Sequence, residues 1–217
     1  MQRFDAILFD LDGTLIDSAP DLIQTLNDLL THYQRPLVAS ELLRQQVSYG
    51  STRLLEIGFA GDYPTPDFHT LRREYLDRYL TQNTVHTTYF DEVEDLLTRI
   101  ESSNLPWGIV TNKPTDCTTA IVEKLGISQR AQAIVCGDTL PVAKPDPSPI
   151  YLACKMMDVD PKRCVYVGDC IRDIEAGRNA DMSTIACAYG YIGADIPISE
   201  WQAEHIANTP LQILDYL

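Results

Sequence analysis

The sequence has few basic residues. Its 217 residues include 17 Lys and Arg against 31 Asp and Glu, which gives a formal net charge of −14 at pH 7, and no lysine occurs before Lys113. An acidic surface repels polyanions, so we expect no binding to nucleic acid or to an anionic membrane through bulk charge. No run reaches the ~18 apolar residues of a membrane-spanning helix, so we also expect no membrane segment.

Cysteine pairs that could hold zinc are absent as well. None of the six cysteines forms a Cys-x-x-Cys pair, and no His lies at zinc-finger spacing from them. The chain opens directly into the apolar run 4–9, so we expect no signal peptide. Several cysteines lie within apolar stretches, which favours reduced thiols in a cytoplasmic protein. The sequence leaves a monomer and a homodimer equally open.

Short apolar stretches alternate with helical patterns over much of the chain. Predicted strands cover 4–9, 107–110, 133–136, 164–167 and 184–187, and predicted helices cover 91–103, 115–125, 148–157 and 171–179. This alternation predicts an α/β fold, in which a Rossmann-like parallel sheet carries helices on both faces. Residues 1–16 and 88–217 would form this core. Segment 193–207 shows no pattern that we can assign.

The stretch between the first strand and residue 88 has a different character. Apolar residues recur at helical spacing over 20–33, 40–47, 51–59 and 67–82, and none of it has a clear strand pattern. We therefore expect residues 17–87 to be an all-helical insert in the core. Ser48, Tyr49 and Arg53 in this insert could meet a bound ligand, although Arg53 could equally be a solvated helix residue.

Polar residues follow the predicted strands, at the edge where an open parallel sheet binds its ligands. These residues are Asp10, Asp12 and Gly13, then Thr111, Asn112 and Lys113, then Lys144 among prolines, then Asp169 and Asp173. Taken singly, several have simpler explanations. Asp12-Gly13 suits a hairpin turn, the Thr-Asn and Asp169/Asp173 pairs suit helix caps, and Lys144 suits a solvated surface.

Taken together, these residues suit phosphate chemistry. Asp10 and Asp12 point to the same side of an extended chain, and Asp169 adds a third carboxylate at the same edge. Three hard oxygen ligands that repel one another favour a bound Mg²⁺. Thr111 and the backbone N–H of Asn112 are donors to phosphate oxygens, and the prolines hold the ammonium group of Lys144 in place.

The four motifs, in this order and each after a strand, resemble those of the haloacid dehalogenase superfamily of phosphohydrolases over the whole chain. The resemblance implies that Asp10 is a nucleophile forming an aspartyl phosphate, and that Asp12 is the general acid and base. It implies that Asp10, the backbone carbonyl of Asp12 and Asp169 hold Mg²⁺. Thr111 and Lys144 would hold the phosphoryl oxygens, and Asp173 would orient Lys144 or a metal-bound water.

The same resemblance implies that 17–87 is a cap that closes over the site and selects a small phosphorylated metabolite. Relatives that cleave carbon–halogen bonds lack an Asp at position 12, and phosphonoacetaldehyde hydrolases need a cap lysine, which this insert lacks. A sugar-phosphate mutase shares the core, but no feature of this sequence demands one. A non-catalytic binding module should have lost Asp10, Asp12, Lys144 or Asp169, and all four are present.

Within the superfamily, the chain resembles the phosphoglycolate phosphatases. It more closely resembles the bacterial phosphatases of N-acetylmuramic acid 6-phosphate, which act in cell-wall recycling. The closer resemblance is carried by Val-Ser-Tyr-Gly at 47–50, Val-Thr-Asn-Lys-Pro at 110–114 and Tyr-Gly-Tyr-Ile at 189–192. A sugar acid needs more room under the cap than a two-carbon acid. Both substrates stay open at this point, with the amino sugar preferred.

Overall fold

The computed structural model describes residues 4–64, 67–193 and 195–217. The strands are β1 (Ala6–Phe9), β2 (Ile16–Asp17), β3 (Thr88–Tyr89), β4 (Trp107–Val110), β5 (Ala133–Val135), β6 (Cys164–Gly168), β7 (Ser183–Cys187) and β8 (His205–Ala207). The α-helices are α1 (Ala19–His32), α2 (Ser40–Arg44), α3 (Gly50–Phe59), α4 (Phe68–Leu80), α5 (Val93–Ser102), α6 (Thr115–Lys124), α7 (Ser148–Met157) and α8 (Ile171–Asn179). Short 3₁₀ turns are η1 (Val47–Tyr49), η2 (Ile127–Gln129), η3 (Pro161–Arg163), η4 (Ile198–Glu200) and η5 (Pro210–Tyr216).

A parallel sheet forms the centre of the molecule. Its strand order over the described residues is β5-β4-β1-β6-β7-β8, and every neighbouring pair is parallel. Side chains of β1 alternate between two faces: Ile7 and Phe9 pack with α5, α6 and η5, whereas Ala6 and Leu8 pack with α7 and α8. The prediction of a Rossmann-like sheet with helices on both faces is therefore confirmed.

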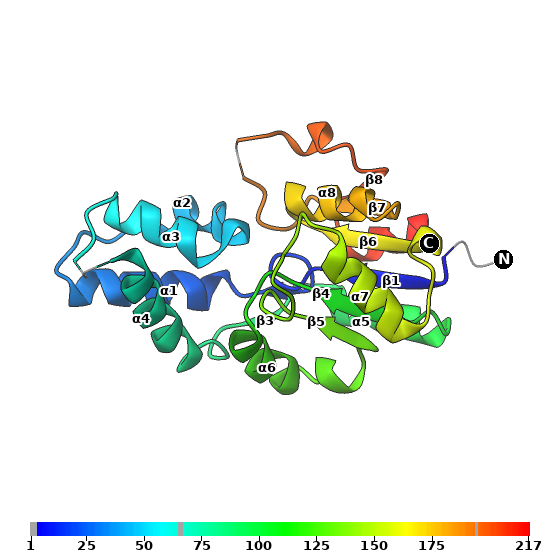
Figure 1. Cartoon of the computed structure of the whole chain (residues 1–217), viewed down its shortest axis with the longest axis horizontal. Helices are drawn as coiled ribbons and strands as arrows, with labels where there is room; N and C mark the ends of the chain where they lie inside the picture. The colour runs from blue at the N-terminus through cyan, green and yellow to red at the C-terminus, as the bar shows by residue number, and fades with distance from the viewer. Residues whose placement is uncertain (1–3, 65–66, 194) are drawn as a thin grey trace.

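Helices α1 to α4 lie beyond the carboxyl ends of the strands, on the left of Figure 1. They share a hydrophobic cluster of their own, built around buried residues such as Leu26, Leu54, Leu71 and Tyr75. The short antiparallel pair β2–β3 joins the places where the chain leaves and re-enters the core. The helical segment is thus attached next to the loop that follows β1.

Three strands were missing from the sequence prediction. β2 and β3 are two residues each, and β8 lies inside the unassigned segment 193–207, of which residue 194 is outside the described residues. The turn at Gly13 does not form a hairpin on β1, because β2 pairs with β3 instead. All six cysteines are free and buried. No described helix is long and apolar enough to cross a membrane.

Candidate active site

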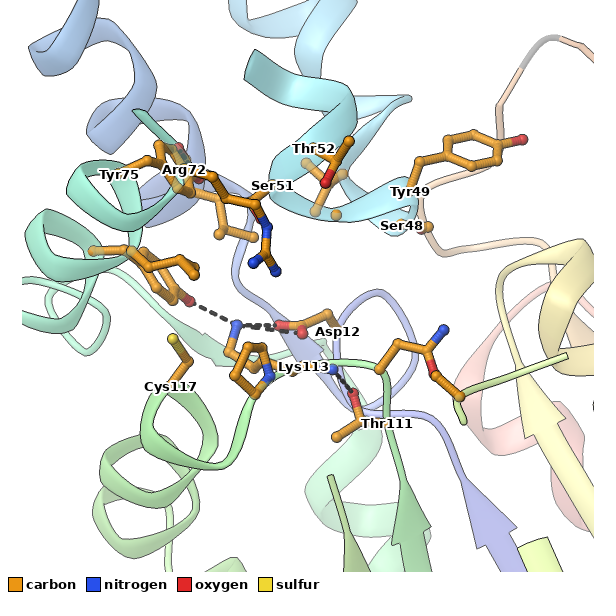
Figure 2. A pocket seen from close by; sticks show the side chains of 18 of the residues that line it. Asp12, Ser48, Tyr49, Ser51, Thr52, Arg72, Tyr75, Thr111, Lys113 and Cys117 are labelled. Atoms are coloured by element: carbon orange, nitrogen blue, oxygen red, sulfur yellow. Dashed lines mark hydrogen bonds and ion pairs between the residues drawn. The ribbon is translucent and has the colours of Figure 1, made fainter. Parts of the chain in front are cut away.

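A cavity of about 270 Å³ lies between the core loops and the helical segment. The core contributes side chains from the loop after β1, from the loop after β4 and from the start of α8, while α1, η1, α3 and α4 contribute the opposite wall (Figure 2). The residues that line it are Asp10, Asp12, Leu22, Val47, Ser48, Tyr49, Gly50, Ser51, Thr52, Arg72, Tyr75, Leu76, Tyr79, Thr111, Asn112, Lys113, Pro114, Cys117, Ala143 and Arg172.

Asp12 is held in the cavity wall by a buried lysine (Figure 2). Lys113 Nζ donates to both carboxylate oxygens of Asp12, at 3.0 and 3.2 Å, and to the Tyr79 hydroxyl of α4 at 2.8 Å. Ser18 Oγ donates to the same carboxylate. The Asp12 carboxylate is therefore oriented from the core and from the helical segment, with an oxygen facing the cavity.

Lys144 lies fully inside the core, opposite Asp10. Its Nζ is 2.9 Å from Asp10 Oδ1 and 2.7 Å from Asp173 Oδ1, and it donates to the Tyr166 hydroxyl at 2.8 Å. Burial alone would lower the pKa of Lys144, but the charges of Asp10 and Asp173 outweigh it and hold that pKa well above its usual value. Lys144 is therefore a fixed positive charge beside Asp10.

The side chain of Asn112 fixes the loop that carries Lys144. Asn112 Nδ2 donates to the Lys144 carbonyl, and Asn112 Oδ1 accepts from the Lys144 N–H, both at 3.0 Å. These two bonds hold the side-chain amide against the loop. The sequence prediction assigns the contact with a phosphate oxygen to the backbone N–H of Asn112.

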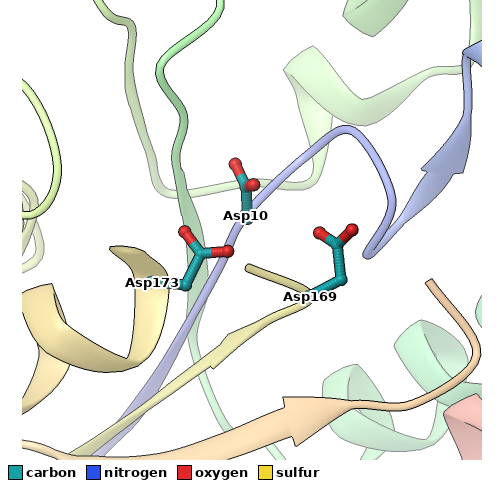
Figure 3. Close-up of side chains that lie close together, drawn as sticks. All are labelled: Asp10, Asp169 and Asp173. Atoms are coloured by element: carbon teal, nitrogen blue, oxygen red, sulfur yellow. The ribbon is translucent and has the colours of Figure 1, made fainter. Parts of the chain in front are cut away.

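Three buried carboxylates meet at the edge of the sheet (Figure 3). Asp10, Asp169 and Asp173 each offer an oxygen, and these oxygens lie within 4.8 Å of one another. Burial, followed by repulsion from Asp173, raises the pKa of Asp10 to about 6. Burial, followed by repulsion from Asp10 and Asp173, raises the pKa of Asp169 to about 8. Such a group of like charges is stabilised by a cation.

The close approach of the chain to Asp169 requires a glycine after Asp12. Gly13 has a φ of +86°, and a Cβ there would lie 2.1 Å from Asp169 Oδ2. Asp169 is oriented by Thr14 Oγ1 at 3.1 Å, by the Tyr191 N–H at 2.9 Å and by Ser48 Oγ at 2.8 Å. A residue of the helical segment thus contacts the acidic cluster directly.

These residues fit a hard divalent cation. Carboxylate oxygens are the ligands that Mg²⁺ prefers. Lys144 pairs with two of the three carboxylates, Asp10 and Asp173, so the cluster keeps an excess of negative charge. Asp10 Oδ1 is buried and faces Lys144 at ion-pair distance, but it accepts no aligned hydrogen bond from any described residue. Asp10 and Asp169 would hold the ion, with Asp173 beside them. The Asp12 carboxylate lies outside this cluster, and its backbone carbonyl as a ligand stays a prediction.

The structure brings most of the predicted site residues together. Asp10, Asp12, Thr111 and Asn112 line the cavity, as do Ser48 and Tyr49. Arg53 does not line it, because its side chain donates to Gln46 and pairs with Glu56 on the outside of α3. The sequence reasoning missed Lys113 as a partner of Asp12, although it quoted the motif that contains it. It also missed Arg72, which no local pattern marks.

Fold and site together define a hydrolase of the haloacid dehalogenase type. The family model described as haloacid dehalogenase-like hydrolase matches residues 7–187, and the chain belongs to this family, as the motifs predicted. A curated relative in Pseudomonas putida, an N-acetylmuramic acid 6-phosphate phosphatase, is 40% identical over 97% of this chain and 95% of its own. A phosphoglycolate phosphatase of Xanthomonas campestris is 42% identical over 96% of this chain and 94% of its own.

A solved structure shows the same architecture. The crystal structure of a protein from Haemophilus somnus, described as a predicted phosphoglycolate phosphatase, superimposes with a TM-score of 0.90 at 29% identity. The match covers 100% of this chain and 99% of that one. The helical segment and the core are therefore both shared with this relative.

Proposed function

We propose that this chain is a Mg²⁺-dependent phosphatase that hydrolyses N-acetylmuramic acid 6-phosphate in the cytoplasm. The observation that carries the proposal is the position of Asp10. Its carboxylate lies in the cavity wall beside Lys144 and within the acidic cluster, at the carboxyl edge of the sheet. The names of two curated relatives, both phosphatases at about 40% identity, support a phosphoric monoester hydrolase.

The first half of the reaction would form an aspartyl phosphate. An oxygen of Asp10 attacks phosphorus while the bond from phosphorus to the leaving alcohol breaks. Asp12 gives a proton to the leaving oxygen. The hydrogen bond from Lys113 orients the Asp12 carboxyl group for this transfer. In the second half, Asp12 takes a proton from a water that attacks the same phosphorus, and Asp10 is released.

Positive charge and donors would hold the transferred phosphoryl group. Thr111 Oγ1 accepts from the Lys113 N–H at 3.2 Å, which leaves its own O–H free to donate into the cavity. Lys144, kept charged by its two carboxylate neighbours, balances negative charge as it builds on the phosphoryl oxygens. Bound Mg²⁺ would supply screening of the repulsion between a carboxylate nucleophile and an anionic phosphate.

We propose that residues 17–87 act as a cap on a core formed by 1–16 and 88–217. The cavity supports this division, because half of its wall comes from the helical segment. Its volume of about 270 Å³ is near the lower limit of ~300 Å³ for small-molecule sites, which suits a small phosphorylated metabolite. The name of the relative at 40% identity favours the amino-sugar phosphate. 2-Phosphoglycolate is the second candidate, favoured by the relative at 42% identity.

Phosphate release from both compounds, measured with Mg²⁺, tests the proposal. We expect kcat/KM to be at least ~10-fold higher for N-acetylmuramic acid 6-phosphate than for 2-phosphoglycolate. Purified Asp10→Asn protein, prepared in the same way, controls for a contaminating phosphatase. A reversed preference would assign the second candidate. Equal, weak rates on both compounds and on p-nitrophenyl phosphate would contradict selective hydrolysis of either.

A further inference from the structure

Three cationic side chains line the cavity, and two of them are already engaged. Lys113 is paired with Asp12. Arg172 donates from Nη2 to the backbone carbonyl of Ser48. The third is Arg72 of α4, and within the described ranges no carboxylate forms an ion pair with it. A protein with a net charge of −14 offers many possible partners, so an arginine left without one is informative.

One hydrogen bond holds the Arg72 side chain in place. Its Nε donates to Ser51 Oγ at 3.1 Å, which connects α4 to the start of α3. A guanidinium has five N–H donors, so the fork formed by its two Nη groups stays available. Figure 2 shows this fork projecting from α4 into the cavity, between Ser51 and Asp12. The bond to Ser51 therefore fixes the direction in which the free end points.

The helix that carries Arg72 is itself anchored at the reaction centre. Tyr79 lies seven residues further along α4, which is about two helical turns and the same face. Its hydroxyl accepts a hydrogen bond from Lys113, which also donates to Asp12. Arg72 is thus positioned relative to the general acid through one rigid element, and it lies on the wall opposite the core loops.

An arginine fork in this position suits a second anion. In the proposed function, on which this inference rests, Lys144 and Thr111 take the phosphoryl group, so Arg72 faces the leaving group. We propose that Arg72 binds a carboxylate of the leaving alcohol, so that the enzyme selects phosphate monoesters whose alcohol carries an acid group. A guanidinium binds a carboxylate through two parallel hydrogen bonds, which makes it more selective than an ammonium.

The test compares substrates with and without the acid group. N-acetylmuramic acid 6-phosphate carries a lactyl ether that ends in a carboxylate, and N-acetylglucosamine 6-phosphate has a hydroxyl group in place of that ether. 2-Phosphoglycolate and ethyl phosphate form a second pair. We expect Arg72→Met to raise KM about 10- to 100-fold for the two carboxylate substrates, as for a lost charge-assisted hydrogen bond, and to leave the other two nearly unchanged. Arg72→Lys should recover part of the loss.

Arg73→Met is the matched control, because Arg73 is the next residue of α4, carries the same charge and is exposed. Its KM for each of the four substrates should equal that of the unmodified enzyme. If Arg72→Met lowers activity equally on both members of each pair, Arg72 only stabilises the packing of α4 against α3, and the inference fails. If the unmodified enzyme hydrolyses none of the four compounds, the proposed function fails instead. Binding of free N-acetylmuramic acid, weakened in Arg72→Met but not in Arg73→Met, would support the inference without turnover.

Discussion

Lys113 Nζ lies 3.0 Å from Asp12 Oδ1, although the two residues are 101 positions apart in the sequence. The ammonium group is buried and also bonds to Tyr79 of the helical segment. One lysine therefore connects the proposed general acid with the wall that faces the leaving group. This geometry makes Lys113 a positioning residue for Asp12.

Replacing Lys113 by Met should reduce turnover more than substrate binding. Without the ammonium, the Asp12 carboxylate loses both hydrogen bonds from Lys113 and keeps the one from Ser18, so it adopts several orientations. Misplacement of a catalytic group by about 1 Å costs on the order of 100-fold in rate. We expect kcat to fall ~30- to 100-fold with KM within about 3-fold. Steady-state phosphate release measures both. Lys155→Met, at an exposed position of α7, should leave both unchanged. A variant whose KM alone rises would show that Lys113 binds substrate rather than positions Asp12.

Asp169 predicts an unusual dependence of stability on pH in the absence of divalent metal. Its pKa of about 8 in the folded protein exceeds the ordinary value near 3.8, so the folded state binds the proton more tightly than the unfolded state. The stability that this proton contributes is present at low pH and is lost as pH rises toward 8. Asp169→Asn cannot ionise, so in EDTA its Tm should exceed that of the unmodified protein by more at pH 8.5 than at pH 5.

With Mg²⁺ at pH 8.5, the unmodified protein should have a higher Tm than Asp169→Asn. Mg²⁺ binds only the folded carboxylate cluster of the unmodified protein and raises its Tm, while Asp169→Asn responds weakly and has no phosphatase activity. Thermal unfolding at the two pH values, with and without Mg²⁺, gives all four comparisons. A Tm difference between the two proteins that is the same at pH 5 and pH 8.5 would contradict the repulsion among Asp10, Asp169 and Asp173.

Asp21 of α1 fixes the place where the chain returns from the helical segment. Its buried carboxylate accepts from the His86 N–H at 3.0 Å, the Thr87 N–H at 2.9 Å and Thr87 Oγ1 at 2.7 Å. Asp21→Ala leaves the two buried donors of Thr87 unpaired and removes the bond from His86, so the free energy of unfolding should fall by about 3 kcal/mol. Urea unfolding measures this, with the exposed Asp77→Ala of α4 as control. Equal stability of the two variants would mean that other contacts hold the return segment.

Much of the core could be predicted because its signals are local. The bounds of α7 and α8 agree with the predicted ranges 148–157 and 171–179, since Pro149 marks one helix start and Asp173 caps the other. β8 could not be predicted, because its three residues pair only with β7 at the edge of the sheet. No alternation of apolar and polar residues marks so short a strand in the sequence.

Some site residues could likewise be predicted from the sequence, and others could not. Asp10, Lys144, Asp169 and Asp173 are expected to converge because parallel strands bring their carboxyl ends to one edge. In the structure Lys144 lies within ion-pair distance of Asp10 and Asp173, and Asp169 offers an oxygen within 4.8 Å of oxygens of both. The orientation of helices α1 to α4 depends on tertiary packing, which the sequence pattern does not report. That is why Arg53 was chosen from its neighbourhood in the sequence, while Arg72, on a different helix, lines the cavity.

Asp10→Asn tests whether Asp10 is the nucleophile. The amide keeps the shape of the side chain, and in EDTA the loss of one charge from the acidic cluster should preserve or increase Tm. Tm is therefore measured in EDTA, and phosphate release from N-acetylmuramic acid 6-phosphate and from 2-phosphoglycolate is measured with saturating Mg²⁺. We expect a folded protein with no detectable turnover of either compound. A folded Asp10→Asn protein that retains near-normal phosphatase activity would contradict this role of Asp10.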